Sequence, residues 1–170
     1  IDCHSPEVLD EIGQLVREQK AVELEEGGVR FKKTTLILGS EIEIYDANCH
    51  GPIHVLCYMP SIEKMKQFSD WMRPLQKNIH LSSQRMYCDG RILQQKVHEL
   101  GGLFIPAHVF TPFKSLFGKG VKESLTEVFD PDLIDAIELG LSSDTTMVSG
   151  IKELARYSFV TNSDAHSLGK

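Results

Sequence analysis

The 170-residue sequence predicts an α/β fold that is a barrel or part of one. Short apolar segments rich in β-branched residues alternate with longer segments whose apolar residues recur at helical spacing. Two of the strand segments are joined by too few residues for a crossover helix, so the fold contains one early hairpin. Several strand segments end in an acidic residue or a histidine, which places these side chains at the rim where α/β folds build their sites.

The chain opens within a strand and continues into a helix. Residues 1–4 have the character of a strand end and no methionine precedes them, so we expect a sequence cut from a longer protein that carries the first strand or strands. The first helix begins with an N-cap at Ser5 and a proline, Pro6, at its first position. We expect this helix and its acidic tail to end at the glycine pair 27–28.

The hairpin is formed by the strand segments 34–45 and 53–58. Residues two apart on a strand share a face, so Glu41 and Glu43 point to the same side. The second strand starts at the end where the first one finishes, and His54 is therefore expected near Glu41.

The later elements continue the alternation. In order, we expect helices at 61–75 and 89–100, a strand at 103–108, an irregular loop at 110–120, a short helix at 122–128, a strand at 135–139, a helix at 145–156 and a final strand with its exit at 158–166. The two helices after the hairpin return the chain to the start of the sheet, so the strand 103–108 runs parallel to the first hairpin strand. No internal linker or repeat is present, which predicts one domain over residues 1–170.

Composition sets limits on the function. The formal net charge of −6 argues against a generally basic nucleic-acid-binding surface, although it leaves room for a local one. No apolar run approaches the roughly 20 residues of a membrane span, and no signal peptide is recognisable. The four cysteines form no C-x-x-C pair, which favours a reduced, cytoplasmic setting without a disulfide framework.

The final strand ends in Asp164 and His166, two residues apart. In extended backbone both side chains point to the same side and can close on one metal ion. Carboxylate oxygen and imidazole nitrogen suit divalent ions such as Zn, Mn and Fe. The alternative is that Asp164 caps a turn and that His166 lies in solvent.

The same pattern recurs at other strand ends along the chain. The candidate metal ligands are Asp2, His4, Glu41, His54, His108, Asp164 and His166. Glu43 is an alternative to Glu41 on the same face, Asp2 is an alternative helix cap, and each histidine could instead be a satisfied core residue. No G-x-S-x-G elbow, Walker-type loop or G-x-G-x-x-G sequence offers a competing chemistry.

A resemblance to a known family follows from these motifs. The ordered set Asp2-Cys3-His4, Gly39-Ser40-Glu41, His54-Val55-Leu56, Pro106-Ala107-His108 and Ser163-Asp164-Ala165-His166 resembles the PHP (polymerase and histidinol phosphatase) metallo-phosphoesterases. The resemblance implies a distorted, TIM-like β/α barrel of seven strands with up to three metal ions. Cys3 interrupts the usual Asp-His dipeptide, which leaves open whether Asp2 or His4 is the ligand, and the opening His-x-His of the family is absent.

Within the family, the segments IDCHSPEVL, LILGSEIEIYD, GLFIPAHVFTPFKSLFGKG and TNSDAHS look most like the endonuclease Q branch. Those enzymes nick DNA on the 5′ side of deaminated bases (uracil, hypoxanthine) and abasic sites, and carry further C-terminal domains. The resemblance implies a metal-dependent hydrolase acting in DNA repair, with DNA as the partner of the full-length protein. Glu41 would bridge metal ions, and Asp164 and His166 would complete the catalytic group.

The loop 110–120 follows His108 directly and offers DNA contacts. Lys114, Lys119 and Lys122 are expected to meet phosphates and Phe113 to stack on a displaced base, the alternative being a surface loop anchored by its phenylalanines. Two other functions compete with the endonuclease: a PHP phosphatase acting on a small phosphomonoester, and a non-catalytic PHP module. With the His-x-His absent, we expect the isolated fragment to have incomplete metal binding and little activity.

Overall fold

The computed structural model describes residues 2–82, 84–141 and 143–163. The helices of this part are α1 Pro6–Arg17, α2 Ile62–Met72, α3 Gly90–Glu99 and α4 Thr145–Val148. The strands are β1 Ala21–Glu23, β2 Val29–Phe31, β3 Thr34–Leu36, β4 Leu38–Ile44, β5 Ile53–Met59, β6 Arg85–Met86, β7 Leu103–Pro106, β8 Ala136–Glu138 and β9 Ser158–Val160. Single helical turns occur at η1 Arg73–Leu75, η2 Leu116–Gly120, η3 Leu125–Glu127, η4 Pro131–Leu133 and η5 Lys152–Leu154.

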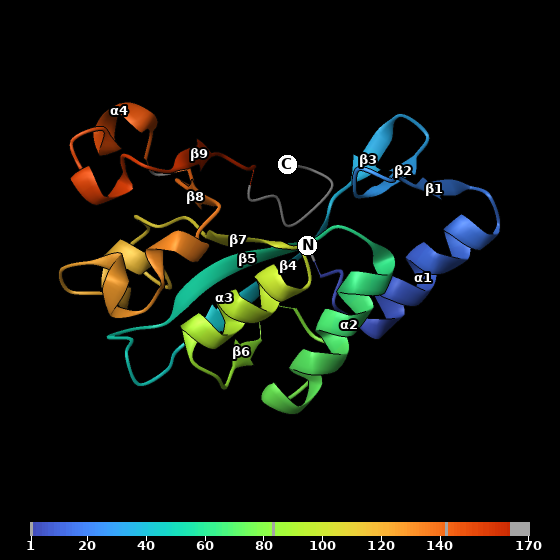
Figure 1. The fold of residues 1–170 in the computed structure, drawn as a ribbon, viewed down its shortest axis with the longest axis horizontal. Coiled ribbons are helices and arrows are strands. Elements are labelled where there is room, and N and C mark those ends of the chain that lie inside the picture. The colour runs from blue at the N-terminus through green and yellow to red at the C-terminus, as the bar shows by residue number, and fades with distance from the viewer. Residues whose placement is uncertain (1, 83, 142, 164–170) are drawn as a thin grey trace.

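The central sheet has the strand order β6-β4-β5-β7 and crosses the middle of the molecule (Figure 1). β4 and β5 pair antiparallel along all seven residues of each strand, and Glu43 lies directly opposite His54. β7 is antiparallel to β5 and therefore runs parallel to β4. The structure thus confirms the predicted hairpin and the predicted direction of the strand that follows the two helices.

The two faces of this sheet have different surroundings. The even-numbered residues of β4, such as Leu38 and Ile42, belong to the main core, which also contains Phe68 of α2 and Leu93 of α3. Figure 1 shows α2 and α3 alongside β4 and β5. Burying a side chain of this size stabilises the fold by about 1.5–3 kcal/mol. The odd-numbered residues of β4 face the other way, and this second face carries the acidic residues and a small separate apolar group around Leu56.

β8 and β9 form a parallel pair next to the end of β7. Asp135 anchors β8, because its backbone N–H donates to Phe104 O and its carboxylate accepts the Phe104 N–H at 2.7 Å. The predicted strands at 135–139 and at the C-terminal end are confirmed at β8 and β9. The predicted helix 145–156 is wrong as one element, because α4 and η5 are separate turns, and the predicted helix 122–128 is only the turn η3.

The first helix ends ten residues earlier than predicted. Glu18 N donates to Gln14 O and Lys20 N donates to Leu15 O, while Gln19 adopts a positive φ of 57° and turns the chain out of the helix. Residues 21–36 then form the antiparallel sheet β1-β2-β3. The predicted strand 34–45 is consequently divided at Ile37 between this small sheet and the central one.

Within the described residues the strands form three separate sheets and no closed barrel. The α/β prediction is confirmed there, and the TIM-like, seven-stranded barrel is not. None of the described helices combines the length and apolar character that crossing a bilayer requires. The cytoplasmic location stays a prediction.

Candidate active site

Glu41 and His54 form the centre of the site on neighbouring strands. His54 Nδ1 lies 2.7 Å from Glu41 Oε1, and both side chains are buried. A carboxylate can only accept, so Nδ1 carries the proton of this contact and Nε2 is the ring nitrogen that remains for another partner. Among the described residues His54 Nε2 has no hydrogen-bond partner, since the Glu43 carboxylate stands at 3.7 Å. The predicted proximity of Glu41 and His54 is confirmed.

His108 follows β7 and lies beside His54, with ring centroids 5.3 Å apart and an interplanar angle of 73°. Its φ of 32° is in the left-handed region, which is unfavourable for a residue with a side chain. Glu138 holds this conformation, because its Oε2 accepts the His108 backbone N–H at 2.9 Å. Gly140, at φ 73°, passes so close that a Cβ there would lie 2.8 Å from the His108 Cβ.

Glu138 is a site residue that sequence reasoning missed. Its Oε2 also lies 3.6 Å from His108 Nδ1, and its Oε1 accepts a hydrogen bond from Asn162 Nδ2 at 2.7 Å. Burial raises the pKa of this carboxyl, but the hydrogen bonds from His108 and Asn162 lower it by more, so the pKa lies below its ordinary value. The sequence does contain a pattern that indicates this role, because Glu138 is an acidic residue at the end of a short apolar strand segment, like the other candidate ligands.

Glu43 joins the same face through two cations. Arg85 Nε donates a hydrogen bond to its Oε1 at 2.7 Å and Arg85 Nη2 lies 2.6 Å from the same oxygen, while Lys114 Nζ lies 3.2 Å from its Oε2. Burial raises the pKa of Glu43, but these two partners lower it by more, and the carboxyl stays ionised. We call Glu41, Glu43, His54, His108 and Glu138 the acid–histidine cluster. The sequence reasoning did not identify Arg85.

The structure does not bring His4 to the acid–histidine cluster. Its Nδ1 lies 2.9 Å from Ser40 Oγ and its Nε2 lies 3.2 Å from Leu81 O, on the side of β4 that packs on α2. Burial lowers the pKa of His4, so the neutral ring is favoured. Asp2 forms an isolated bridge with Ser40, and its buried Oδ1 has no hydrogen-bond partner among the described residues.

Asp164 and His166 lie outside the described residues. The segment that leads to them reaches the cluster, because Asn162 contacts Glu138 and Val160 pairs with Glu138 across β8 and β9.

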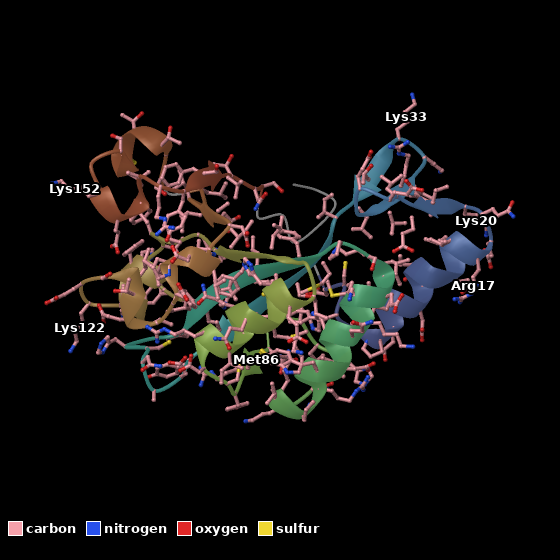
Figure 2. All side chains as sticks on the ribbon, viewed as in Figure 1. Arg17, Lys20, Lys33, Met86, Lys122 and Lys152 are labelled. Atoms are coloured by element: carbon pink, nitrogen blue, oxygen red, sulfur yellow. The ribbon has the colours of Figure 1, made fainter. Side chains whose placement is uncertain are left out.

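The structure places the predicted DNA-contacting residues at different distances from the acid–histidine cluster. Lys114 lies at the cluster, where its backbone carbonyl accepts the His54 N–H at 2.9 Å, and Lys119 Nζ lies 5.0 Å from the centre of the exposed Phe113 ring. Lys122 is exposed and projects from the outer end of the molecule (Figure 2). Within the loop the rings of Phe110 and Phe117 stack with their centroids 5.3 Å apart, and the DNA contacts stay a prediction.

The donor atoms of the cluster are of the kind that Zn, Mn and Fe accept. His54 Nε2, which has no hydrogen-bond partner among the described residues, could bind such an ion. The carboxylates of Glu41 and Glu138 lie beside the two histidines, where a carboxylate commonly orients a metal-binding histidine. Yet no group of three or more His, Cys, Asp and Glu side chains in the described part of the chain is arranged to hold a metal ion. The described residues therefore fit part of a metal site.

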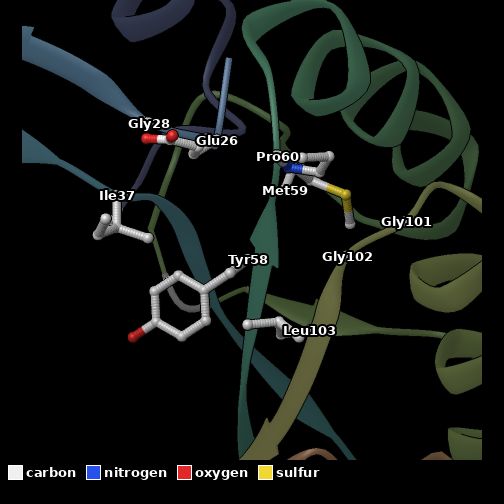
Figure 3. A pocket seen from close by; sticks show the side chains of 10 residues that line it. Glu26, Gly28, Ile37, Tyr58, Met59, Pro60, Gly101, Gly102 and Leu103 are labelled. Atoms are coloured by element: carbon white, nitrogen blue, oxygen red, sulfur yellow. The ribbon is translucent and has the colours of Figure 1, made fainter. Parts of the chain in front are cut away.

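A separate pocket of about 340 Å³ lies at the other end of the central strands. Its lining residues are Glu26, Gly27, Gly28, Ile37, Tyr58, Met59, Pro60, Gly101, Gly102 and Leu103. Figure 3 shows the Tyr58 ring between Ile37 and Leu103. The lining is mostly apolar and contains none of the acid–histidine cluster, so this pocket is not the candidate active site.

No protein-family model matches the chain. It is 64% identical over all 170 residues to the uncharacterized protein YqxK of Bacillus subtilis (strain 168), of which it spans 44%. Over 112 residues, 65% of the chain, it is 31% identical to the uncharacterized protein MJ0043 of Methanocaldococcus jannaschii, of which the match spans 12%. The chain thus covers less than half the length of these curated relatives.

Two solved structures resemble the chain over 98% of its length at 26% sequence identity, and the match covers 39% of each of them. One is the lesion-specific endonuclease PfuEndoQ from Pyrococcus furiosus, with a TM-score of 0.82. The other is endonuclease Q in complex with a 27-mer duplex substrate that has an abasic lesion at the active site, with a TM-score of 0.81. The fold of the chain is therefore similar to a region of endonuclease Q.

Proposed function

We propose that the protein to which this chain belongs is a metal-dependent DNA-repair endonuclease that nicks DNA on the 5′ side of deaminated bases or abasic sites. The observation that carries the proposal is the buried acid–histidine cluster, on a fold similar to that of endonuclease Q over nearly the whole chain. The lesion specificity in the printed names of those structures supports the choice of substrate.

In this proposal Glu41, His54 and His108 hold divalent metal ions together with Asp164 and His166, and Asp2 is a further ligand. Zn, Mn or Fe bound there would activate a water and neutralise charge on the phosphoryl oxygens. Glu41 keeps the His54 ring oriented through Nδ1. Glu138 holds the backbone of His108 and places a carboxylate beside its ring. His166 is assigned the transfer of a proton, which imidazole performs well near neutral pH.

The loop after β7 is proposed as the local DNA-binding surface of an otherwise acidic chain. Lys119 and Lys122 are exposed, and Phe113 presents an exposed ring beside Lys119. Replacement of Lys114, Lys119 and Lys122 by alanine in the full-length protein should weaken DNA binding and flatten its dependence on salt, because fewer counterions are released. An unchanged salt slope would remove the loop from the proposal.

The central test is an activity assay of the full-length protein on duplex DNA with a uracil or an abasic site, with and without a chelator, together with metal analysis. We expect nicking 5′ of the lesion that the chelator abolishes. Asp164→Asn and Glu41→Gln should abolish nicking without loss of the fold. Full activity of Asp164→Asn, or activity untouched by chelators, contradicts the proposal. Hydrolysis of a generic phosphate ester without DNA nicking would favour a phosphatase, and inactivity on both with metal retained would favour a non-catalytic module.

A further inference from the structure

Glu43 connects two cations that come from distant parts of the chain. Arg85 lies on β6, directly across from Glu43 in the parallel pairing of β4 and β6, and Lys114 lies on the loop after β7. The carboxylate between them is buried, whereas the side chains of Arg85 and Lys114 are 41% and 52% exposed. Each cation therefore turns part of its surface to solvent at the edge of the acid–histidine cluster.

Arg85 lies against an exposed aromatic ring, and a second exposed ring immediately precedes Lys114 in the chain. The Arg85 guanidinium lies 5.1 Å from the centre of the Tyr45 ring, which is 46% exposed and follows β4 directly. Phe113, 69% exposed, immediately precedes Lys114 and lies under Lys119. Tyr45 with Arg85 is thus one cation–aromatic pair at Glu43, and Phe113 with Lys119, next to Lys114 in the loop, is a second.

Both cations retain hydrogen-bonding capacity. Glu43 Oε1 accepts a hydrogen bond from Arg85 Nε and lies 2.6 Å from Nη2, whereas the guanidinium carries five N–H donors in all. Lys114 has three donors and a positive φ of 54°, an unfavourable backbone conformation that the hydrogen bond from His54 N to its carbonyl holds in place. The hydrogen bond therefore keeps Lys114 at the cluster in an unfavourable backbone conformation.

We propose that these two pairs bind one unstacked stretch of a DNA strand at the acid–histidine cluster: Tyr45 and Phe113 each stack on a base, while Arg85 on one side of Glu43 and Lys114 with Lys119 on the other hold phosphates. This arrangement is what sequence-tolerant binding of an unstacked strand requires. The inference rests on the proposed function and assigns Tyr45 and Arg85, which lie outside the loop 110–120, to substrate binding. Arg85 provides the planar donor fork that phosphate favours.

The test measures binding of the full-length protein to abasic-site DNA by fluorescence anisotropy across a salt series. Tyr45→Ala should weaken binding about tenfold, because a stacked base is lost, while Tyr45→Phe should bind like the wild type. Arg85→Gln should reduce the salt slope by about 0.7–0.9, the share of one phosphate contact.

Two other cation–aromatic pairs provide matched controls. Phe31 lies under Lys32 at 5.1 Å on β2, and Arg156 stacks on Tyr157 and bonds Asp132, as Arg85 stacks on Tyr45 and bonds Glu43. Phe31→Ala and Arg156→Gln should leave affinity and salt slope unchanged. If Arg85→Gln fails to fold, the comparison of Tyr45→Ala with Tyr45→Phe tests the inference. The Tyr45 side chain is half-exposed, so its replacement should leave the fold intact.

The outcomes separate the inference from the proposed function. A wild-type protein that binds and nicks lesion DNA, with Tyr45→Ala indistinguishable from Phe31→Ala, overturns the inference and leaves the function standing. A wild-type protein that neither binds nor nicks lesion DNA overturns both. Loss of affinity in Tyr45→Ala and Phe31→Ala alike also overturns the inference, because the effect would not be specific to the cluster.

Discussion

Oε2 of Glu138 accepts the backbone N–H of His108 at 2.9 Å and lies 3.6 Å from Nδ1 of the same residue. One carboxylate oxygen therefore holds the strained backbone of His108 and lies beside its ring. Carboxylates in this position beside a metal-binding histidine fix its tautomer and its orientation.

Glu138→Gln should lower kcat for nicking by about 10- to 100-fold in the full-length protein, with KM little changed. The amide that replaces the carboxylate turns an NH2 group toward either His108 or Asn162, both of which donate to Glu138. Glu153→Gln is a matched control, because Glu153 also accepts a backbone N–H, that of Leu125, far from the cluster. Equal kcat values for the two variants would show that Glu138 has no part in positioning.

Gly140→Ala should destabilise the fold and reduce nicking. The residue has a φ of 73°, where alanine is strained by about 1 kcal/mol, and the added Cβ would lie 2.8 Å from that of His108. Gly150→Ala should be neutral, since no described atom lies within 4 Å of a Cβ built there. Urea denaturation of both variants checks the prediction, and equal unfolding free energies would contradict it.

His4→Ala should lower the free energy of unfolding by about 3 kcal/mol, because a cavity forms and the polar groups of Ser40 and Leu81 lose their partner. Glu41→Gln should change stability far less while abolishing nicking. Denaturation and nicking assays on the same preparations separate the two roles. Wild-type stability in His4→Ala, with metal content reduced, would instead support the sequence-based assignment of His4 as a ligand.

The pH dependence of stability should reflect Glu43. Its pKa in the folded protein lies below the ordinary value of 4.5, because the bonds from Arg85 and Lys114 outweigh the effect of burial. Between the folded and unfolded pKa values the unfolded chain binds more protons, so the contribution is complete above pH 4.5 and is lost as the pH falls below it. Urea unfolding at successive pH values should show a flatter acid limb for Glu43→Gln. An acid limb as steep as that of the wild type would refute this assignment.

The sequence alone predicted the hairpin and the proximity of Glu41 and His54 correctly, because the alternation along 38–44 and the short connection to β5 leave one arrangement. It did not predict the position of His4, because Asp2 makes only an isolated bridge and the rule that residues two apart share a face needs a continuous strand. Glu138 was overlooked although its strand has the same pattern as the others. Its importance depends on β8 lying beside the end of β7, a contact between distant parts of the chain.

The end of α1 shows a different limit. The chain leaves the helix at Gln19 in a left-handed conformation that glycine usually provides, so composition gave no sign of the stop. The short strands β1, β2 and β3 are three residues each, and such lengths carry little periodic signal. Arg85 was also missed, because its role comes from the pairing of a two-residue strand with β4.

The alternation of apolar and acidic side chains along β4 also limits which insertions and deletions the strand tolerates in evolution. Inserting or deleting one residue within the strand would exchange its two sides, pressing Glu41 and Glu43 against α2 and turning Ile42 outward. Length changes are therefore confined to the connections at its ends. Point substitutions at 41 or 43, in contrast, leave the apolar side of β4 intact, so the acidic side can change while the packing of the sheet is kept.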